Sequence, residues 1–203
     1  MTEKLLHAGV LLARQGRRLI VCVISLFSCA LSAPGTAAEI HVNTTRHGDT
    51  FEVQATAVIQ VDVAEAWKVL TDYERLTEFV PGLQESKVVS RNGSNVVLDQ
   101  SGEAHLLFFK FPMRVRLAIT EFPRSRVVST AIAGNFRQMQ GIYRLEAQGK
   151  GMQLRYEGSF TPDFDFPPFF GTLLVRSTLE KRFAAMVHEI EKRRRGDSVP
   201  GKR

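Results

Sequence analysis

Apolar and polar residues alternate along the chain between residues 51 and 61, with Val58 as the one exception. Successive side chains of a β-strand point to opposite faces, so this period of two predicts a strand with one buried and one wet face. The apolar face of this first strand consists of Phe51, Val53, Ala55, Ala57, Ile59 and Val61.

A longer alternation over residues 105–121 predicts the longest strand of the sheet. Pro112 lies inside it and has no backbone N–H to donate, so we expect an edge or a bend there. The apolar face of this strand is Leu107, Phe109, Phe111, Met113, Val115, Leu117 and Ile119. Further strands are predicted at 83–91 and 94–101 around an Asn92-Gly93 turn, and at 126–133, 136–148 and 152–160.

Two short helices are predicted between the first strand and the second. Asp62 occupies an N-cap position, and Glu65 follows three residues later, as in a capping box ahead of apolar residues at helical spacing. The second helical stretch, over residues 73–79, is stopped by Pro81 and Gly82.

From Gly171 onward the apolar residues recur at helical spacing and predict a long C-terminal helix. Such a stripe must pack on an apolar surface, and the inner face of the sheet is the only large one available. We therefore expect an α+β fold in which a curved antiparallel sheet wraps around this helix. The stripe is Val175, Leu179, Phe183, Met186, Val187 and Ile190, and the opposite side carries Arg176, Glu180, Lys181, His188 and Lys192.

The N-terminal segment has the layout of a secretory signal peptide. Basic residues precede an apolar run over residues 19–31, and small residues follow it up to Ala38. The run is shorter than the roughly 20 residues that a bilayer-spanning helix needs. We expect cleavage after Ala38 and a periplasmic or secreted protein. Lipid modification of Cys29 is the alternative, because residues 26–29 loosely resemble a lipoprotein signal.

The domain organisation that follows is simple. Residues 1–38 form the signal peptide, 39–48 a mobile segment, 49–195 one ligand-binding domain and 196–203 a basic tail. Cys22 and Cys29 both lie in the apolar run, so the mature chain is expected to form no disulfide and to rely on a packed core.

The formal net charge is +6, a mild bias whose excess gathers at the C-terminal end. Cations are favourable at the negative end of a helix dipole, so we interpret this cluster as a solvated helix end. Transient contact with an anionic membrane surface is the alternative. No nucleic acid partner is expected.

The order of these elements, together with three sequence motifs, resembles the START-like (SRPBCC) superfamily, especially its polyketide cyclase/dehydrase and coenzyme Q-binding branch. The motifs are TDYERLTEFVPGLQESKVV at 71–89, FFKFPMRVRLAITE at 108–121 and GNFRQMQGIYRLE at 134–146. The resemblance covers about residues 50–192. It implies a helix-grip fold with a deep apolar cavity for lipids, quinones or polycyclic compounds, and it implies no particular reaction.

Candidate ligand-binding residues fall into three groups. Gln140, Tyr143 and Tyr156 lie on predicted strands, where an inward amide or hydroxyl would orient the polar end of a ligand. For the tyrosines, a hydrogen bond to a backbone carbonyl is the alternative. Aromatic residues that line either a pocket or an ordinary core are Trp67, Phe79, Phe109, Phe111 and Phe183.

The third group is Phe169 and Phe170, in the segment DFDFPPFFG directly before the long helix. We expect these rings at the rim of the cavity, as a lid or a membrane-touching patch. Burial in the core without a functional role stays open as the alternative.

Catalytic and metal-binding signatures are not apparent in the sequence. There is no G-x-S-x-G nucleophile elbow, and the histidines are scattered. Asp163 and Asp165 are interpreted as solvated carboxylates of a rigid turn rather than a cation site. We expect no cofactor and no metal.

The sequence therefore favours an exported binding or carrier protein for a hydrophobic small molecule or lipid. A cyclase/dehydrase that guides a polycyclic substrate by positioning and proton transfer is the second hypothesis. A protein-interaction module of the cell envelope is the third.

Overall fold

The computed structural model describes residues 38–106, 109–164 and 171–197. Their elements are β1 (Ile40–His47), β2 (Thr50–Ile59), α1 (Val63–Leu70), the 3₁₀ helix η1 (Tyr73–Glu78), β3 (Leu83–Asn92), β4 (Asn95–Leu106), β5 (Phe109–Phe122), β6 (Arg126–Gly134), β7 (Phe136–Gln148), β8 (Gly151–Pro162) and α2 (Gly171–Asp197).

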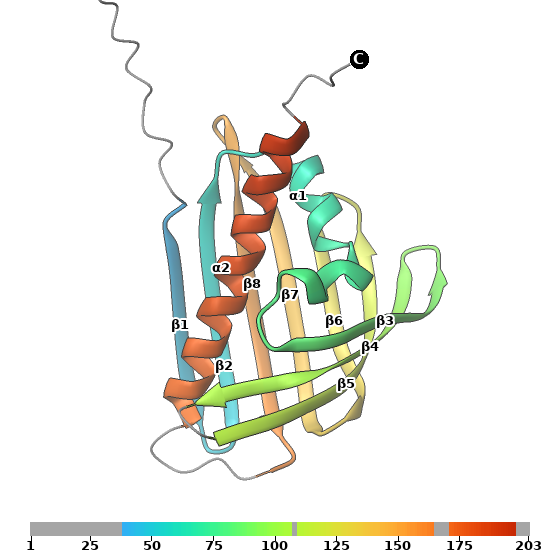
Figure 1. Cartoon of the computed structure of the whole chain (residues 1–203), viewed down its shortest axis with the longest axis vertical. Helices are drawn as coiled ribbons and strands as arrows, with labels where there is room; N and C mark the ends of the chain where they lie inside the picture. Colours follow the sequence, from blue (N-terminus) through green and yellow to red (C-terminus); the bar gives the residue numbers. More distant parts are fainter. Residues whose placement is uncertain (1–37, 107–108, 165–170, 198–203) are drawn as a thin grey trace, which may run out of the picture. The chain divides into compact units, whose positions relative to one another are not determined.

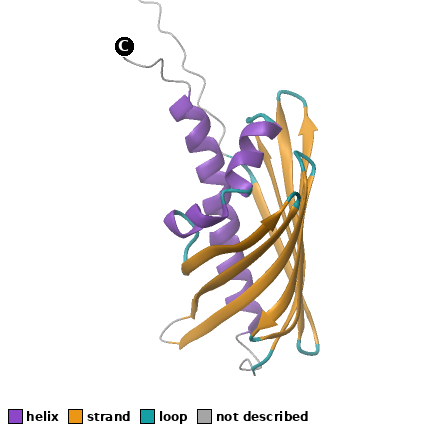
Figure 2. Ribbon diagram, turned by 90° about the vertical axis from the view of Figure 1, so that its right-hand side faces the viewer, coloured by secondary structure: helices purple, strands orange, loops and turns teal. Residues whose placement is uncertain are grey.

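The strands form one antiparallel sheet in the order β1-β2-β8-β7-β6-β5-β4-β3. The sheet curves, and all three helices lie on the same face of it (Figure 2). Helix α2 runs across this face (Figure 1). This arrangement confirms the predicted α+β helix-grip architecture.

The core lies between the sheet and the helices. The alternating apolar positions of β2, from Phe51 to Ile59, are all at most 2% exposed, as the period-two pattern predicts. The stripe predicted for α2 is also confirmed, since Val175, Phe183 and Ile190 are buried and its charged residues face outward.

The two short helices begin and end close to the predicted residues. Asp62 caps α1, because its carboxylate accepts a hydrogen bond from the Ala64 N–H at 2.6 Å. Glu65 forms an ion pair with Lys68 at 2.7 Å. The second helical stretch is present as η1, whose backbone remains in the tighter 3₁₀ form.

Two predicted segments differ in the structure. Residues 40–47, assigned from the sequence to a mobile segment, form the edge strand β1 along β2, with Val42 opposite Ala55. Residues 105–121 are not one strand, because β4 runs to Leu106 and β5 begins at Phe109. Pro112 pairs with β4 at a point where β5 has no partner in β6, because β6 ends opposite Val115, so the proline lies at a local edge as predicted.

None of the described helices has the length and apolar character needed to span a membrane. The predicted signal peptide and most of the basic tail lie outside the described residues.

Candidate ligand-binding site

Two adjoining compartments lie between α2 and the inner face of the sheet. The space open to the centres of water-sized molecules is about 80 Å³ in the first and about 180 Å³ in the second. A single buried water needs only roughly 10–15 Å³ on this measure, so both exceed a water site. The first is lined by Ala104, Phe111, Met113, Phe136, Met139, Tyr156, Phe160, Pro162, Phe164, Leu174, Val175, Thr178, Leu179 and Arg182.

The second compartment is larger and mostly apolar, with more polar groups in its lining than the first. It is lined by Ala55, Leu70, Tyr73, Leu76, Val80, Leu83, Leu98, Gln100, Leu117, Ile119, Val127, Ser129, Met139, Tyr143, Tyr156, Leu179, Arg182, Phe183 and Met186. Met139, Tyr156, Leu179 and Arg182 line both compartments, so these residues mark the junction between them.

A pair of glycines makes room for the tyrosines at this junction. Gly141 of β7 lies opposite Gly158 of β8. The ring of Tyr156 lies over both, and a side-chain carbon added at Gly158 would collide with its hydroxyl oxygen. Tyr143 packs beside Tyr156 with ring centroids 4.7 Å apart. The absent side chains therefore let a large ring lie flat on the sheet and leave space above it.

The three tyrosines of the cavity differ in their hydrogen bonding. Tyr73 donates to the Glu121 carboxylate at 2.9 Å. The hydroxyls of Tyr143 and Tyr156 have no hydrogen-bond partner among the described residues. Burial raises the pKa of Tyr143, and it raises that of Tyr156 to about 12. Both hydroxyls therefore remain protonated donors at neutral pH.

Arg182 brings a positive charge to the same junction. Its Nε donates to the carbonyl oxygen of Pro81 at 3.1 Å, and its Nη1 lies 3.9 Å from the sulfur of Met113. Nη2 is buried and has no partner. Burial lowers the pKa of Arg182, and the nearby Tyr143 and Tyr156 partly offset this decrease.

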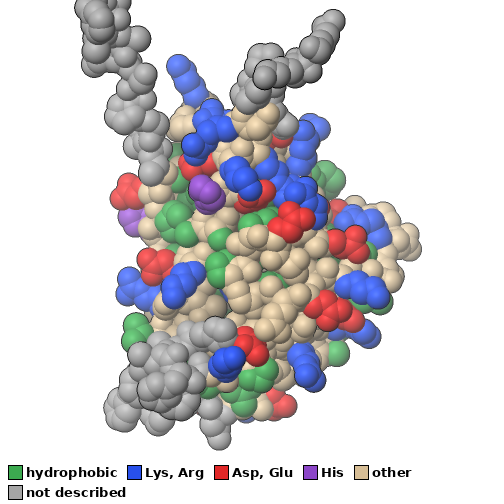
Figure 3. All heavy atoms as spheres, in the orientation of Figure 1, with side chains coloured by type: hydrophobic (Ala, Val, Ile, Leu, Met, Phe, Trp, Pro, Cys, Tyr) green, Lys and Arg blue, Asp and Glu red, His purple; other side chains and the backbone are tan. Residues whose placement is uncertain are grey.

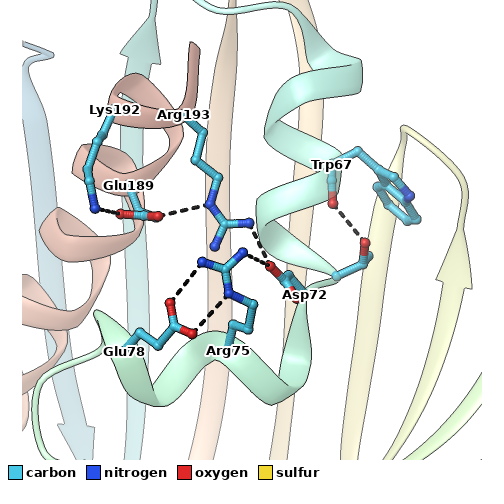
Figure 4. Close-up of polar contacts among 8 residues, drawn as sticks. Trp67, Asp72, Arg75, Glu78, Glu189, Lys192 and Arg193 are labelled. Carbon is cyan, nitrogen blue, oxygen red and sulfur yellow. Dashed lines mark hydrogen bonds and ion pairs between the residues drawn. The ribbon is translucent and has the colours of Figure 1, made fainter. Parts of the chain in front are cut away.

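At the C-terminal end of α2, a polar network ties the helix to the segment that follows α1 (Figure 4). Arg193 donates to Asp72 at 2.6 Å and to Glu189 at 2.9 Å. Lys192 also donates to Glu189, and Arg75 lies 3.5 Å from Asp72. Burial acts to raise the pKa of Glu189, but hydrogen bonds from Arg193 and Lys192 outweigh it and lower the pKa.

Exposed Lys and Arg side chains gather over the same end of α2 (Figure 3). Lys192 and Arg195 each form an ion pair with a glutamate of the preceding helical turn. Such pairs on a solvated surface fit the interpretation of this cluster as a helix end.

The structure brings together four of the predicted ligand-binding residues. Phe111, Tyr143, Tyr156 and Phe183 line the cavity. The alternative for Tyr143 and Tyr156 was a hydrogen bond from the hydroxyl to a backbone carbonyl, and neither forms one with the described residues.

Other predicted site residues lie elsewhere. Trp67 and Phe79 pack against the core and line neither compartment. Gln140 is exposed on the outer face of the sheet, because its neighbours Met139 and Gly141 face inward. The side chain of Phe109, and Phe169 and Phe170 entirely, lie outside the described residues.

Arg182 was missed by the sequence analysis. It follows Leu179 by three residues and so borders the apolar stripe of α2, the position of an ordinary flanking charge. Among the described residues, no group of three His, Asp or Glu side chains is placed to hold a metal ion. Asp163 is exposed.

Sheet, long helix and internal apolar cavity together define a helix-grip protein of the START-like superfamily. Residues 59–190 match the profile of the family described as polyketide cyclase/dehydrase and lipid transport. The chain belongs to this family, which binds hydrophobic ligands or lipids. No curated protein matches the sequence significantly.

Solved structures share the fold at low sequence identity. The Zhui aromatase/cyclase from Streptomyces sp. R1128 is 14% identical, with a TM-score of 0.61 and coverage of 78% of this chain and 99% of that one. A STAR-related lipid transfer protein from Xanthomonas axonopodis is 11% identical, with a TM-score of 0.60 over 76% and 94% of the two chains. A START superfamily protein from Mycobacterium smegmatis is 15% identical, with a TM-score of 0.58 over 70% and 97%.

Proposed function

We propose that this protein is an exported carrier that binds a hydrophobic small molecule between α2 and the sheet. The observation that carries the proposal is the pair of adjoining compartments, whose walls are mostly apolar. Water gains little by occupying such a space, whereas an apolar ligand gains the free energy of leaving water. The similar fold of a lipid transfer protein supports the same assignment.

Export is supported by the order of basic, apolar and small residues before Glu39. N-terminal sequencing of the protein from its own host tests this part. A chain beginning near Glu39 outside the cytoplasm is expected. A cytosolic chain that retains its first residues would show that export is wrong, and it would leave the binding function intact.

Native mass spectrometry of protein purified from its own host is the direct test of binding, with the extracted ligand identified. The sharpest variant is Met139→Trp, because Met139 lies at the junction of the compartments. A bulky ring there should lower ligand occupancy at least about tenfold.

Gln140→Trp is the matched control, because Gln140 is the next residue of the same strand and is exposed on the outer face. It should leave occupancy unchanged. Thermal melts of both variants show whether each is folded. Equal occupancy in folded Met139→Trp and wild type would rule out this cavity as the binding site.

A second candidate is cyclase/dehydrase chemistry. It is favoured by the unpaired hydroxyls of Tyr143 and Tyr156, because such donors can polarise a carbonyl oxygen. Chemical analysis of the recovered ligand distinguishes a carrier from a cyclase/dehydrase. A carrier returns the bound molecule unchanged after incubation, whereas an enzyme returns it cyclised or dehydrated.

A further inference from the structure

Among the described residues, the cavity lining contains one full positive charge, that of Arg182, and no carboxylate. Arg182 lines both apolar compartments, and no Asp or Glu of the described chain forms an ion pair with it. Its acceptors are a single backbone carbonyl and a methionine sulfur, which is a weak acceptor. A guanidinium has five N–H donors, so most of its hydrogen-bonding capacity is unused.

The neighbouring polar groups are also donors. Tyr143 and Tyr156 line the same compartment as Arg182, and both act to raise its pKa. Their hydroxyls have no acceptor within the described chain. Within the described chain, the junction therefore presents a cation and two O–H groups, and Arg182 has no anionic acceptor there.

A purely structural role for Arg182 explains less of this arrangement. Its bond to the Pro81 carbonyl fixes the turn after η1, but a neutral donor would suffice for that bond. A buried charge without a counterion is unfavourable, and protein interiors normally pair such charges. A ligand that supplies an oxyanion would complete the site.

We propose that Arg182 binds the oxyanion of an amphipathic ligand, a carboxylate on an apolar body, with Tyr143 and Tyr156 as additional donors and the body in the compartments. This inference rests on the proposed carrier function and names the ligand class. A neutral lipid or hydrocarbon would leave the charge unpaired, so the site should discriminate against it.

The test compares cis-parinaric acid with its methyl ester, in which a methyl group removes the charge of the carboxylate, by fluorescence titration of the full chain. The wild type should bind the acid about ten- to a hundredfold more tightly than the ester, as expected for charged hydrogen bonds. Arg182→Met should abolish this preference, because it should lower the affinity for the acid and leave the affinity for the ester unchanged. Arg182→Lys, which keeps the charge, should retain part of it.

Arg176→Met is the matched control, because Arg176 lies on the exposed side of the same helix. It should bind like the wild type, and thermal melts confirm that each variant is folded. Equal affinity of the wild type for acid and ester, or a preference that survives Arg182→Met, would overturn the role of Arg182 and leave the carrier function standing. Failure of both probes to bind the folded wild type would count against both proposals.

Discussion

Arg182 and Arg193 lie on α2 eleven residues apart, which is about three helical turns, so they occupy nearly the same side of one helix. Arg193 forms hydrogen bonds with Asp72 and Glu189. Arg182, inside the cavity, has no carboxylate partner among the described residues. Arg193 thus closes the structure near the C-terminal end of the helix, where it is paired, whereas Arg182 remains available to a ligand near the middle of the helix.

The largest expected effect concerns the packing around the two arginines. Ile190, near Arg193, is fully buried and lines neither compartment, whereas Met186 borders the second one. Ile190→Ala should lower the free energy of unfolding by about 4 kcal/mol, because it leaves a new cavity in a packed region. Met186→Ala should lower it by about 2 kcal/mol only, because Met186 already borders an open compartment and its packing is less complete. Urea unfolding measures both. Equal costs would indicate that Met186 is as tightly packed as Ile190.

Removing each arginine tests the contrast in pairing directly. Arg193→Met leaves Asp72 and the buried Glu189 short of a partner and should cost about 2–3 kcal/mol. Arg182→Met removes an unpaired charge from an apolar site, so stability should change by less than about 1 kcal/mol. Thermal and urea melts of the ligand-free proteins give both values. The reverse order would assign the structural role to Arg182.

The smallest effect is on the acid side of the stability profile. The pKa of Glu189 is lowered in the fold, so the folded state binds this proton less readily than the unfolded state. The resulting stabilisation is present above the ordinary glutamate pKa of about 4.3 and is lost as pH falls through the lower folded value.

Glu189→Gln should remove this component. The difference in unfolding free energy between wild type and variant should therefore become smaller as the pH falls from 5 to 3. Urea melts at each pH measure this difference. Burial acts to lower the pKa of Arg193, but its hydrogen bonds to Glu189 and Asp72 outweigh it and raise the pKa, so Arg193 keeps its charge throughout this range. A difference that stays constant over that interval would exclude Glu189 as the titrating group.

Much of the fold could be predicted from the sequence because burial imposes a local period. The alternation in β2 and the helical stripe of α2 each record which face contacts the core. The strand β1 escaped prediction because its pattern is weak: of the residues on its inner side only Ile40 and Val42 are apolar, and its outward side chains are exposed.

The candidate site was harder to predict. The pairing of β7 with β8 shifts register between Phe136 and Gln138. Gln140 lies beyond this shift, where the regular alternation with Tyr143 places it on the outer face. The bulge reverses which residues face inward, so Phe136 and Met139 both line the cavity although they are three residues apart. No pattern in the sequence marks this shift. Arg182 could not be distinguished from a solvated arginine until the sheet enclosed it.

The pairing of β2 with β8 has a consequence for the order in which the cavity can form. Phe51 lies opposite Phe160, so β1 and β2 cannot join the rest of the sheet until most of the domain has been synthesised. Helix α2 follows later still and supplies one wall. A growing chain therefore exposes its apolar inner face for most of its synthesis, and contacts this distant in sequence form slowly. Such a protein depends on being kept apart from other chains until its last helix arrives, and it can acquire a ligand only after that.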